Sequence, residues 1–288
     1  MKKARTLPVK VFLALVALVY IAPILIIMTN SFMKPGEIAR NYGDQYDAFD
    51  YTMEGKTHYA EYHLIPEVVS AEQYLALFFT TPEYLDMFVN SLRLTLPIVL
   101  LQIVTGTAAA YGFTVWKFRF KEIIFCVYII LMLLPFQTTL VSNYIIADRL
   151  KILNTHLSII LPWGFSPFAA FIMRQSMKGI PYSFFEAAQI DGANQWRKFI
   201  HIAVPLSAGG LASLVILVFT DCWAMVEQPL IFLRDANLEP LSVFLSQIGR
   251  EEIGLIFAAS VFYMTPAVWI FLYGQEYFEQ GIKLSAIK

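Results

Sequence analysis

Six apolar stretches of near-membrane length recur along this chain, and they limit what it can fold into. Inside a bilayer every backbone polar group has to be satisfied within the protein, which leaves α-helices and closed barrels as spanning structures. A helix needs about 20 mostly apolar residues to cross the hydrocarbon layer. The stretches that approach this length are 11–28, 94–115, 123–141, 157–173, 208–226 and 255–273. The sequence therefore predicts an all-α integral membrane protein with six transmembrane helices.

Composition leads to the same class of protein. Of the 288 residues, 58% are hydrophobic and 15% are charged, whereas soluble domains average about 45–50% apolar and about 25% charged residues. The formal net charge is −1, and no Lys/Arg cluster lies beyond the N-terminal segment. Membrane lipid is therefore an expected partner, and nucleic acid is not.

The first apolar stretch follows a basic N-terminal segment and could be mistaken for a signal peptide. It is longer than the usual hydrophobic region of about 7–15 residues, and Met28 is followed by a poor cleavage site. We expect a retained helix and three parts of the chain. They are an N-terminal segment with the first span (1–30), an extracytoplasmic loop (31–88) and a core of five spans (89–288).

The distribution of Lys and Arg predicts the orientation. With the N-terminus inside, the inner segments, which include Lys117, Arg174 and Arg197, carry more basic residues than the outer segments. Basic residues favour the cytoplasmic side of a membrane. Both termini and the segment 176–205, between the fourth and fifth spans, are therefore expected in the cytoplasm.

The outer loop 31–88 is rich in acidic and aromatic residues. It has two interpretations, a folded cap over the outer mouth or a contact with a partner that delivers solute. His58 and His63 lack a nearby set of further ligands, so we expect no metal site there.

The segment 176–205 has the signals of two short helices. Pro181 suits a first helical turn, and Gly192 suits the residue that ends a helix, so 182–190 is predicted to be helical. Asn194 is placed to cap a second helix. In that helix an apolar side and a polar side are expected. The apolar side would hold Trp196, Phe199, Ile200 and Ala203, and the polar side Arg197, Lys198 and His201.

Two interpretations of this helix pair compete. It could be an interfacial amphipathic hairpin that only links two spans. Alternatively it could dock onto a partner, since Ala187, Ala188 and Ala193 are small enough for close approach, and Glu186 and Asp191 offer carboxylates to basic groups.

Polar residues interrupt some of the predicted spans. Pro135 breaks the third, and Gln137, Thr138 and Asn143 follow it. Such residues either line a solute path or satisfy neighbouring helices. Asp221 is the acidic residue inside the predicted fifth span, and intramembrane carboxylates are often functional. These four polar side chains are the candidate substrate path.

The chain contains no recognisable catalytic set. Neither a phosphate-binding G-x-x-x-x-G-K-[ST] loop nor the common metal-protease or serine-hydrolase motifs occur. We expect no enzyme activity and no cofactor bound by this chain. If the chain drives uphill transport, the energy has to come from a partner.

The helix-pair segment resembles the "EAA" loop of the membrane subunits of binding-protein-dependent ABC importers. Shorter pieces elsewhere, among them 135–137, 160–162 and 229–233, match the carbohydrate-importer, maltose-type branch in chain order. The matching loop residues are Glu186, Ala187, Ala188, Asp191, Gly192, Ala193, Phe199, Ile202 and Pro205.

This resemblance implies a permease subunit in a bacterial-type cytoplasmic membrane. It implies a second permease subunit, two ATP-binding subunits that hold ATP and Mg, and an extracytoplasmic solute-binding protein as partners. The loop between spans four and five would be the coupling helix. The expected function is to form half of the pathway for a sugar or oligosaccharide. Alternatives are an ABC permease for another solute such as a polyamine or phosphate ester, an ion-coupled secondary carrier, and a non-transporting membrane scaffold.

Overall fold

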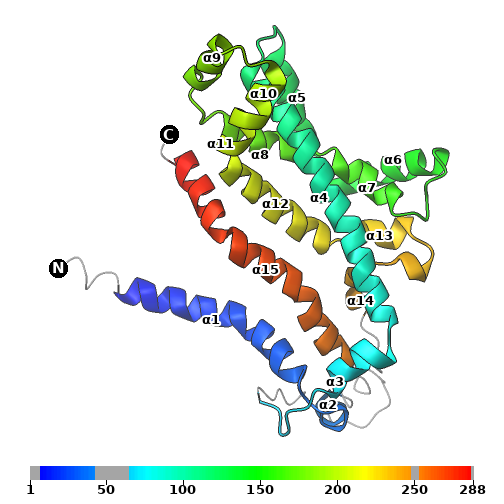
Figure 1. Ribbon diagram of the computed structural model, residues 1–288. Coiled ribbons are helices and arrows are strands. Elements are labelled where there is room, and N and C mark those ends of the chain that lie inside the picture. Colours follow the sequence, from blue (N-terminus) through cyan, green and yellow to red (C-terminus); the bar gives the residue numbers. More distant parts are fainter. Residues whose placement is uncertain (1–6, 43–64, 248–252, 287–288) are drawn as a thin grey trace. The chain divides into compact units, whose positions relative to one another are not determined.

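The computed structural model describes residues 7–42, 65–247 and 253–286 (Figure 1). These residues form helices, turns and loops, and none of them is in a strand. The predicted all-α class is therefore confirmed for the described part of the chain. His58 and His63, and most of the acidic residues of the outer loop, lie outside the described residues.

The chain forms two compact units, Met1–Asp86 with Phe244–Thr265 and Met87–Val243 with Pro266–Lys288. The first unit contains α1 (Leu7–Asn30), α2 (Pro35–Tyr42), α3 (Glu72–Leu75) and the π-helix η3 (Ala76–Thr80). Helices α4 (Glu83–Val115), α14 (Leu241–Ser246) and α15 (Ile253–Ala286) contribute residues to both units.

The core of the first unit forms where α2 packs on the start of α15. Met33, Ile38 and Tyr42 are buried there, and Ile253 and Phe257 pack against them. Met33, Ile38 and Tyr42 belong to the predicted outer loop 31–88, and they form part of a packed core. A folded cap, one of the two interpretations of this loop, requires such a core.

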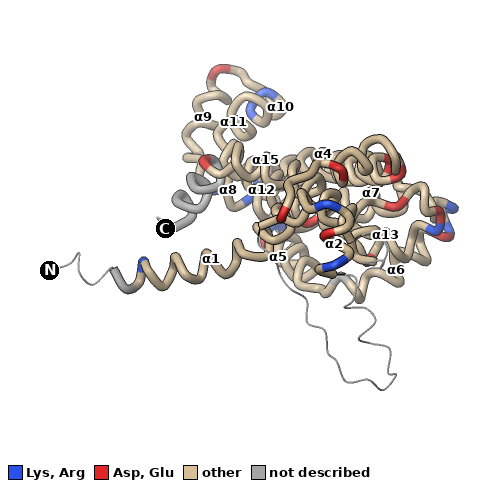
Figure 2. The backbone as a smooth tube through the Cα atoms, turned by 90° about the horizontal axis from the view of Figure 1, so that it is seen from below, with Lys and Arg blue, Asp and Glu red and all other residues tan. Residues whose placement is uncertain are grey.

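Helix α1 presents apolar side chains around most of its circumference. Phe12 is 64% and Tyr20 78% exposed, and the backbone tube of α1 is uncharged except near its start (Figure 2). A helix that is apolar all round is typical of a membrane span. The expectation of a first span near 11–28 therefore matches the helical segment Val9–Asn30.

The second unit holds the remaining helices. In chain order they are α5 (Lys121–Met132), α6 (Phe136–Arg149), α7 (Leu157–Gly164), α8 (Pro167–Met177), α9 (Ser183–Ile190), α10 (Gln195–Lys198), the π-helix η4 (Phe199–Ala203), α11 (Val204–Leu206), α12 (Ala208–Trp223), α13 (Glu227–Phe232) and the 3-10 helix η5 (Ala236–Leu238).

Helix α8 lies at the centre of this unit because glycines let its neighbours approach closely. A Cβ on Gly106 of α4 would lie 2.5 Å from the Cβ of Ala169, and one on Gly210 of α12 would lie 2.3 Å from the Cβ of Ser176. Met173 and Met177 of α8 are fully buried. Small residues at such contacts are typical of helix pairs in membranes.

Four helical segments in the described residues are long and apolar enough to cross a membrane: Val9–Asn30, Glu83–Val115, Leu157–Met177 and Ile253–Glu276. The predicted third span is not one straight helix, since Lys121–Met132 and Gln137–Arg149 meet at 97°. The bend follows from Pro135, which cannot continue a helix and stands at the N-cap of α6. The predicted fifth span is α12, which meets Gln195–Leu206 at 73°. The number of spans is therefore between four and six, depending on whether each bent pair crosses the membrane.

Candidate functional site

The candidate site is the segment from Pro181 to Leu206, which we call the arm. Its first helix, α9, begins one residue after the predicted start and ends at the predicted Ile190. Gly192 has φ +77°, a left-handed conformation that glycine adopts without strain. The turn is closed by backbone hydrogen bonds from Gly192 N to Gln189 O (3.1 Å) and from Ala193 N to Ala188 O (2.9 Å).

The second half of the arm begins with the expected cap. The Asn194 side-chain oxygen accepts a hydrogen bond from Arg197 N at 2.9 Å. Helix α10 then continues into the π-helix η4 and into α11, so that the chain runs without a loop to Leu206. The cap and the glycine turn fix the geometry between α9 and α10 locally.

Tyr111 of α4 anchors both halves of the arm. Its ring centre lies 6.3 Å from that of Phe185 on α9 and 5.2 Å from that of Phe199 on η4, both edge-on. Its hydroxyl donates a hydrogen bond to Gln195 Oε1 at 2.8 Å. Tyr111 and Phe185 are buried, so the arm rests on the end of α4 through a small aromatic cluster.

The predicted division of the second arm helix into two sides is wrong in part. Lys198, expected on the polar side, is only 4% exposed, whereas Trp196 and Ile200, expected on the apolar side, are 70% and 53% exposed. The π-helical turn at Phe199–Ala203 changes the angular spacing of the side chains. The contact of Phe199 with Tyr111 then decides which side faces the protein.

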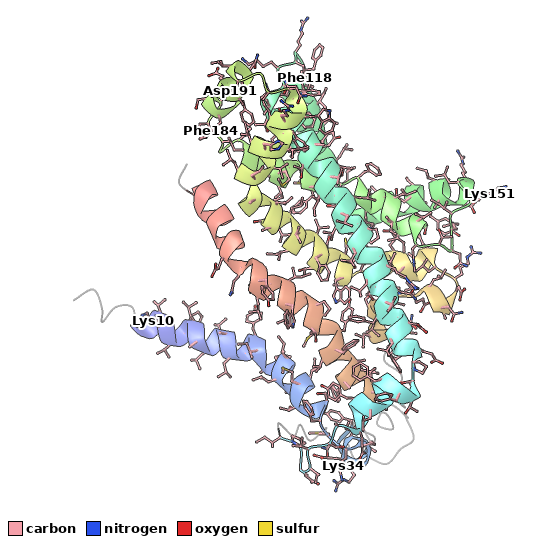
Figure 3. All side chains as sticks on the ribbon, in the orientation of Figure 1. Lys10, Lys34, Phe118, Lys151, Phe184 and Asp191 are labelled. Carbon is pink, nitrogen blue, oxygen red and sulfur yellow. The ribbon has the colours of Figure 1, made fainter. Side chains whose placement is uncertain are left out.

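The remaining arm residues predicted to dock a partner are accessible. Those that are exposed are Glu186, Ala187, Asp191, Gly192 and Pro205. Those that are partly buried are Ala188, Ala193 and Phe199. Figure 3 labels Phe184 and Asp191 on the arm.

Large apolar side chains on the arm are also exposed. Phe184 is 51% and Ile190 87% exposed, beside the exposed Trp196. Apolar side chains of this size gathered around one turn are typical of a surface that meets a partner. No sequence motif singles out Phe184 or Ile190, and their signal is that they are apolar residues near Glu186 and Gly192.

A buried arginine stands at the base of the arm. Arg174 Nη2 donates to Glu122 Oε1 of α5 at 2.6 Å, and its Nε donates to the Phe113 carbonyl at the end of α4 at 3.2 Å. Its guanidinium carbon lies 3.7 Å from the centre of the Phe125 ring. One side chain of α8 thereby ties α4 to α5. The sequence marked Arg174 as an inner basic residue at the end of an apolar stretch, and did not predict that its side chain is buried.

The candidate substrate-path residues lie on two helices. Gln137, Thr138 and Asn143 are in α6, and Asp221 is in α12. Gln137 Nε2 donates to Glu227 Oε2 of α13 at 3.3 Å, and both side chains are exposed. Thr138 instead donates to the Pro135 carbonyl at 2.7 Å. Glu227 is therefore an addition to this polar set that the sequence did not suggest.

Residues 102–284 match the family described as binding-protein-dependent transport system inner membrane component. The chain belongs to this family. The match covers more than half of the chain, including α8, the arm and α12. The chain is therefore a membrane permease subunit and not an enzyme in itself. Membership of this family implies a multi-pass protein of the inner membrane, in a complex with ATPase and solute-binding partners.

Three similar proteins illustrate the family. The chain is 27% identical to the arabinooligosaccharides transport system permease protein AraQ of Bacillus subtilis, over 96% of this chain and 94% of AraQ. It is 27% identical to the lactose transport system permease protein LacG of Rhizobium radiobacter, over 74% and 79% of the two chains. It is 29% identical to the sn-glycerol-3-phosphate transport system permease protein UgpE of Pectobacterium atrosepticum, over 70% and 74%.

One solved structure is similar over nearly the whole chain. It is described as a bacterial ABC transporter involved in the import of the acidic polysaccharide alginate, and the match has a TM-score of 0.78. The sequence identity is 18%, with 96% of this chain and 97% of that chain covered. This similarity shows the fold of the permease.

Proposed function

We propose that this permease forms half of the transmembrane pathway for a sugar or oligosaccharide. The relatives named for arabinooligosaccharide and lactose transport support this class of solute. The proposed assembly adds a second permease subunit, two ATP-hydrolysing subunits that hold ATP and Mg, and an extracytoplasmic binding protein that delivers the solute.

The accessible apolar surface of the arm is the observation that carries the mechanism. Ile190, Trp196 and Phe184 are exposed around a rigid turn, so they fit a groove of the ATPase on the cytoplasmic side. Tyr111 connects the arm to α4, and Arg174 of α8 connects α4 to α5. Movement of the arm on ATP binding therefore reaches several helices at once. The transport cycle is a shift between two packed states that open to opposite faces.

In this proposal the solute passes the polar side chains Gln137, Thr138, Asn143 and Asp221, with Glu227 beside Gln137. Asn143 is partly buried, and the others are exposed. Hydroxyl-rich solutes are bound by amide and carboxylate groups through hydrogen bonds. Both termini lie in the cytoplasm together with the arm, as the basic residues indicate.

Cross-linking tests the docking of the arm. In a background with Cys126 and Cys222 replaced by Ser, Ile190→Cys should cross-link to the copurifying ATPase subunit. Leu150→Cys is the matched control, because Leu150 is 60% exposed and lies beside Lys151, far from Asp191 in the second unit (Figure 3). Equal yields at the two positions, or none at Ile190, would contradict the proposal.

A second experiment identifies the solute class. The reconstituted complex with its binding protein should hydrolyse ATP faster with one member of a panel of sugars and oligosaccharides. Stimulation by sn-glycerol 3-phosphate instead would favour the phosphate-ester alternative, which the similarity to UgpE supports. Uptake that follows an ion gradient and does not require ATP would indicate a secondary carrier.

A further inference from the structure

An open pocket of about 430 Å³ lies between the arm and the turn that joins α4 to α5. The turn contributes Trp116, Lys117 and Phe118, and the arm contributes Tyr182, Gln189 and Lys198. None of these residues belongs to the exposed docking surface of Phe184, Ile190 and Trp196. The pocket is therefore a separate feature of the same end of the second unit.

Lys198 is an unusual residue to find in the wall of this pocket. Its side chain is only 4% exposed, and its ammonium donates one long hydrogen bond, to Gln189 Oε1 at 3.4 Å. Within the described residues no carboxylate lies within ion-pair distance of it. An ammonium offers three donors, and burying a charge without a counter-charge is unfavourable. An anion in the pocket would remove this cost.

A second cation is held at the same pocket. The Lys117 ammonium lies 5.3 Å from the centre of the Tyr182 ring, a distance at which the ring quadrupole attracts a cation. The amide of Gln189 adds donors that suit a phosphate oxygen. Two ammonium groups and an amide around one opening favour a phosphate group over a neutral ligand.

The surroundings indicate where such a phosphate comes from. The turn lies directly between the end of α4 at Val115 and the start of α5 at Lys121, and Trp116 and Phe118 are 52% and 41% exposed. Exposed aromatic and basic residues at the ends of membrane helices are typical of the headgroup region. Basic pockets between helices at this depth bind anionic lipid headgroups.

We infer that this pocket binds the phosphate of an anionic phospholipid headgroup, with Lys198 and Lys117 as its cationic ligands. The lipid would wedge between the arm and the α4–α5 turn and stabilise the arm in one position. This inference requires only that the chain lies in a membrane, and it holds whatever the solute is.

Native mass spectrometry of the full chain, purified with its copurifying subunits, tests the inference. The protein is titrated in detergent with dioleoylphosphatidylglycerol or with dioleoylphosphatidylcholine. We expect retention of phosphatidylglycerol in preference to phosphatidylcholine. Lys198→Gln and Lys117→Gln should each weaken this retention about tenfold, the effect of one charge-assisted hydrogen bond. Arg197→Gln is the matched control, because it removes an exposed charge from the same short helix and should change nothing.

Four outcomes would overturn the inference. Equal retention of the two lipids, or no effect of Lys117→Gln, would show that the pocket does not select an anionic phospholipid headgroup. Displacement of phosphatidylglycerol by excess inorganic phosphate would assign the site to a soluble phosphate. Loss of the ATPase subunit from the lysine variants, with lipid retention unchanged, would assign the pocket to a carboxylate of that partner.

Lys117 is exposed, so its variant remains informative if Lys198→Gln does not fold. Lipid retention is measured without any transport assay. The result therefore tests lipid binding separately from the proposed transport function.

Discussion

The Tyr111 hydroxyl donates a hydrogen bond to Gln195 Oε1 at 2.8 Å, across 84 residues of sequence. It joins the end of helix α4 to the first residue of α10 on the arm. The same ring contacts Phe185 and Phe199. One side chain of α4 therefore contacts α9, α10 and η4 of the arm and helps to fix the position of the arm relative to α4.

Tyr111→Phe separates the hydrogen bond from the ring packing. The variant retains both aromatic contacts and loses a bond of about 1 kcal/mol, so amide hydrogens of the arm should exchange roughly fivefold faster by local opening. Hydrogen exchange followed by mass spectrometry on the peptides covering α9 and α10 measures this. Tyr128→Phe is the control, since that ring packs on Phe113 away from the arm. Unchanged exchange in Tyr111→Phe would mean that the rings alone anchor the arm.

The Gly192 turn tests the role of the arm through backbone conformation alone. A Cβ at Gly192 would meet nothing within 4 Å, but its φ of +77° disfavours other residues by about 1–2 kcal/mol. Gly192→Val should lower solute-stimulated ATPase activity and uptake more than Gly192→Asn, because Asn tolerates the left-handed region. Gly192→Pro should abolish coupling, because it also removes the hydrogen bond to Gln189 O.

Membrane insertion and subunit assembly of these variants should remain as in the wild type, which quantitative blotting of membranes checks. Replacing Glu186, which is exposed on the same helix pair, should likewise reduce coupling without affecting insertion. Wild-type uptake and ATPase stimulation in Gly192→Pro would refute the coupling role of the arm.

Local signals in the sequence were sufficient to predict parts of the arm. Gly192 predicted the left-handed turn, Asn194 predicted the helix cap, and the boundary at Ile190 was confirmed, because each depends on the conformation of a few adjacent residues. The apolar stretches predicted the helical class and the start of α12 at Ala208 for the same reason. The function followed from the resemblance at the loop, which the family match confirmed.

Features that depend on contacts between distant residues could not be predicted in this way. Pro135 indicated an interruption, but no local signal gives the angle of 97° between the two helices that meet there. The π-helical turn at Phe199–Ala203 and the burial of Lys198 accompany contacts with the distant residue Tyr111 and with Gln189. Nothing local marks Gln102 and Gln228 as partners of Trp163, although Gln102 Nε2 donates to the Trp163 carbonyl at 2.8 Å and Trp163 Nε1 donates to Gln228 Oε1.

The Arg174 cluster gives a prediction about stability. Arg174→Met should lower the free energy of unfolding by about 2–4 kcal/mol, since it removes a buried guanidinium together with its bonds to Phe113 O and Glu122. Glu122→Gln should cost less, about 0.5–1 kcal/mol, because the Glu122 side chain is 68% exposed and Gln retains an oxygen acceptor. Thermal unfolding of the detergent-solubilised complex, followed by size-exclusion chromatography, ranks the two variants.

The double variant Arg174→Met/Glu122→Gln measures how strongly the two residues are coupled. It should be no less stable than Arg174→Met alone, because the ion pair is already lost in the single variant. Additive losses would instead mean that Glu122 contributes through contacts other than Arg174.

The close contact between α4 and α8 provides a test of the packing. Gly106→Ala places a Cβ 2.5 Å from Ala169 Cβ and 2.9 Å from the Ala169 carbonyl carbon, so the helices have to move apart, at a cost of about 1–3 kcal/mol. Gly112→Ala on the same helix adds the same methyl group where nothing lies within 4 Å.

Both substitutions improve the intrinsic helix propensity by the same amount, about 0.8–1.0 kcal/mol. The difference between the two variants therefore isolates the clash with Ala169. We expect Gly106→Ala to unfold at a lower temperature than the wild type and Gly112→Ala to unfold at the same or a higher temperature, in thermal unfolding assays of the same complex. If the two variants unfold together, α4 and α8 do not pack at Gly106 in the membrane, and the central position of α8 in the second unit would have to be abandoned.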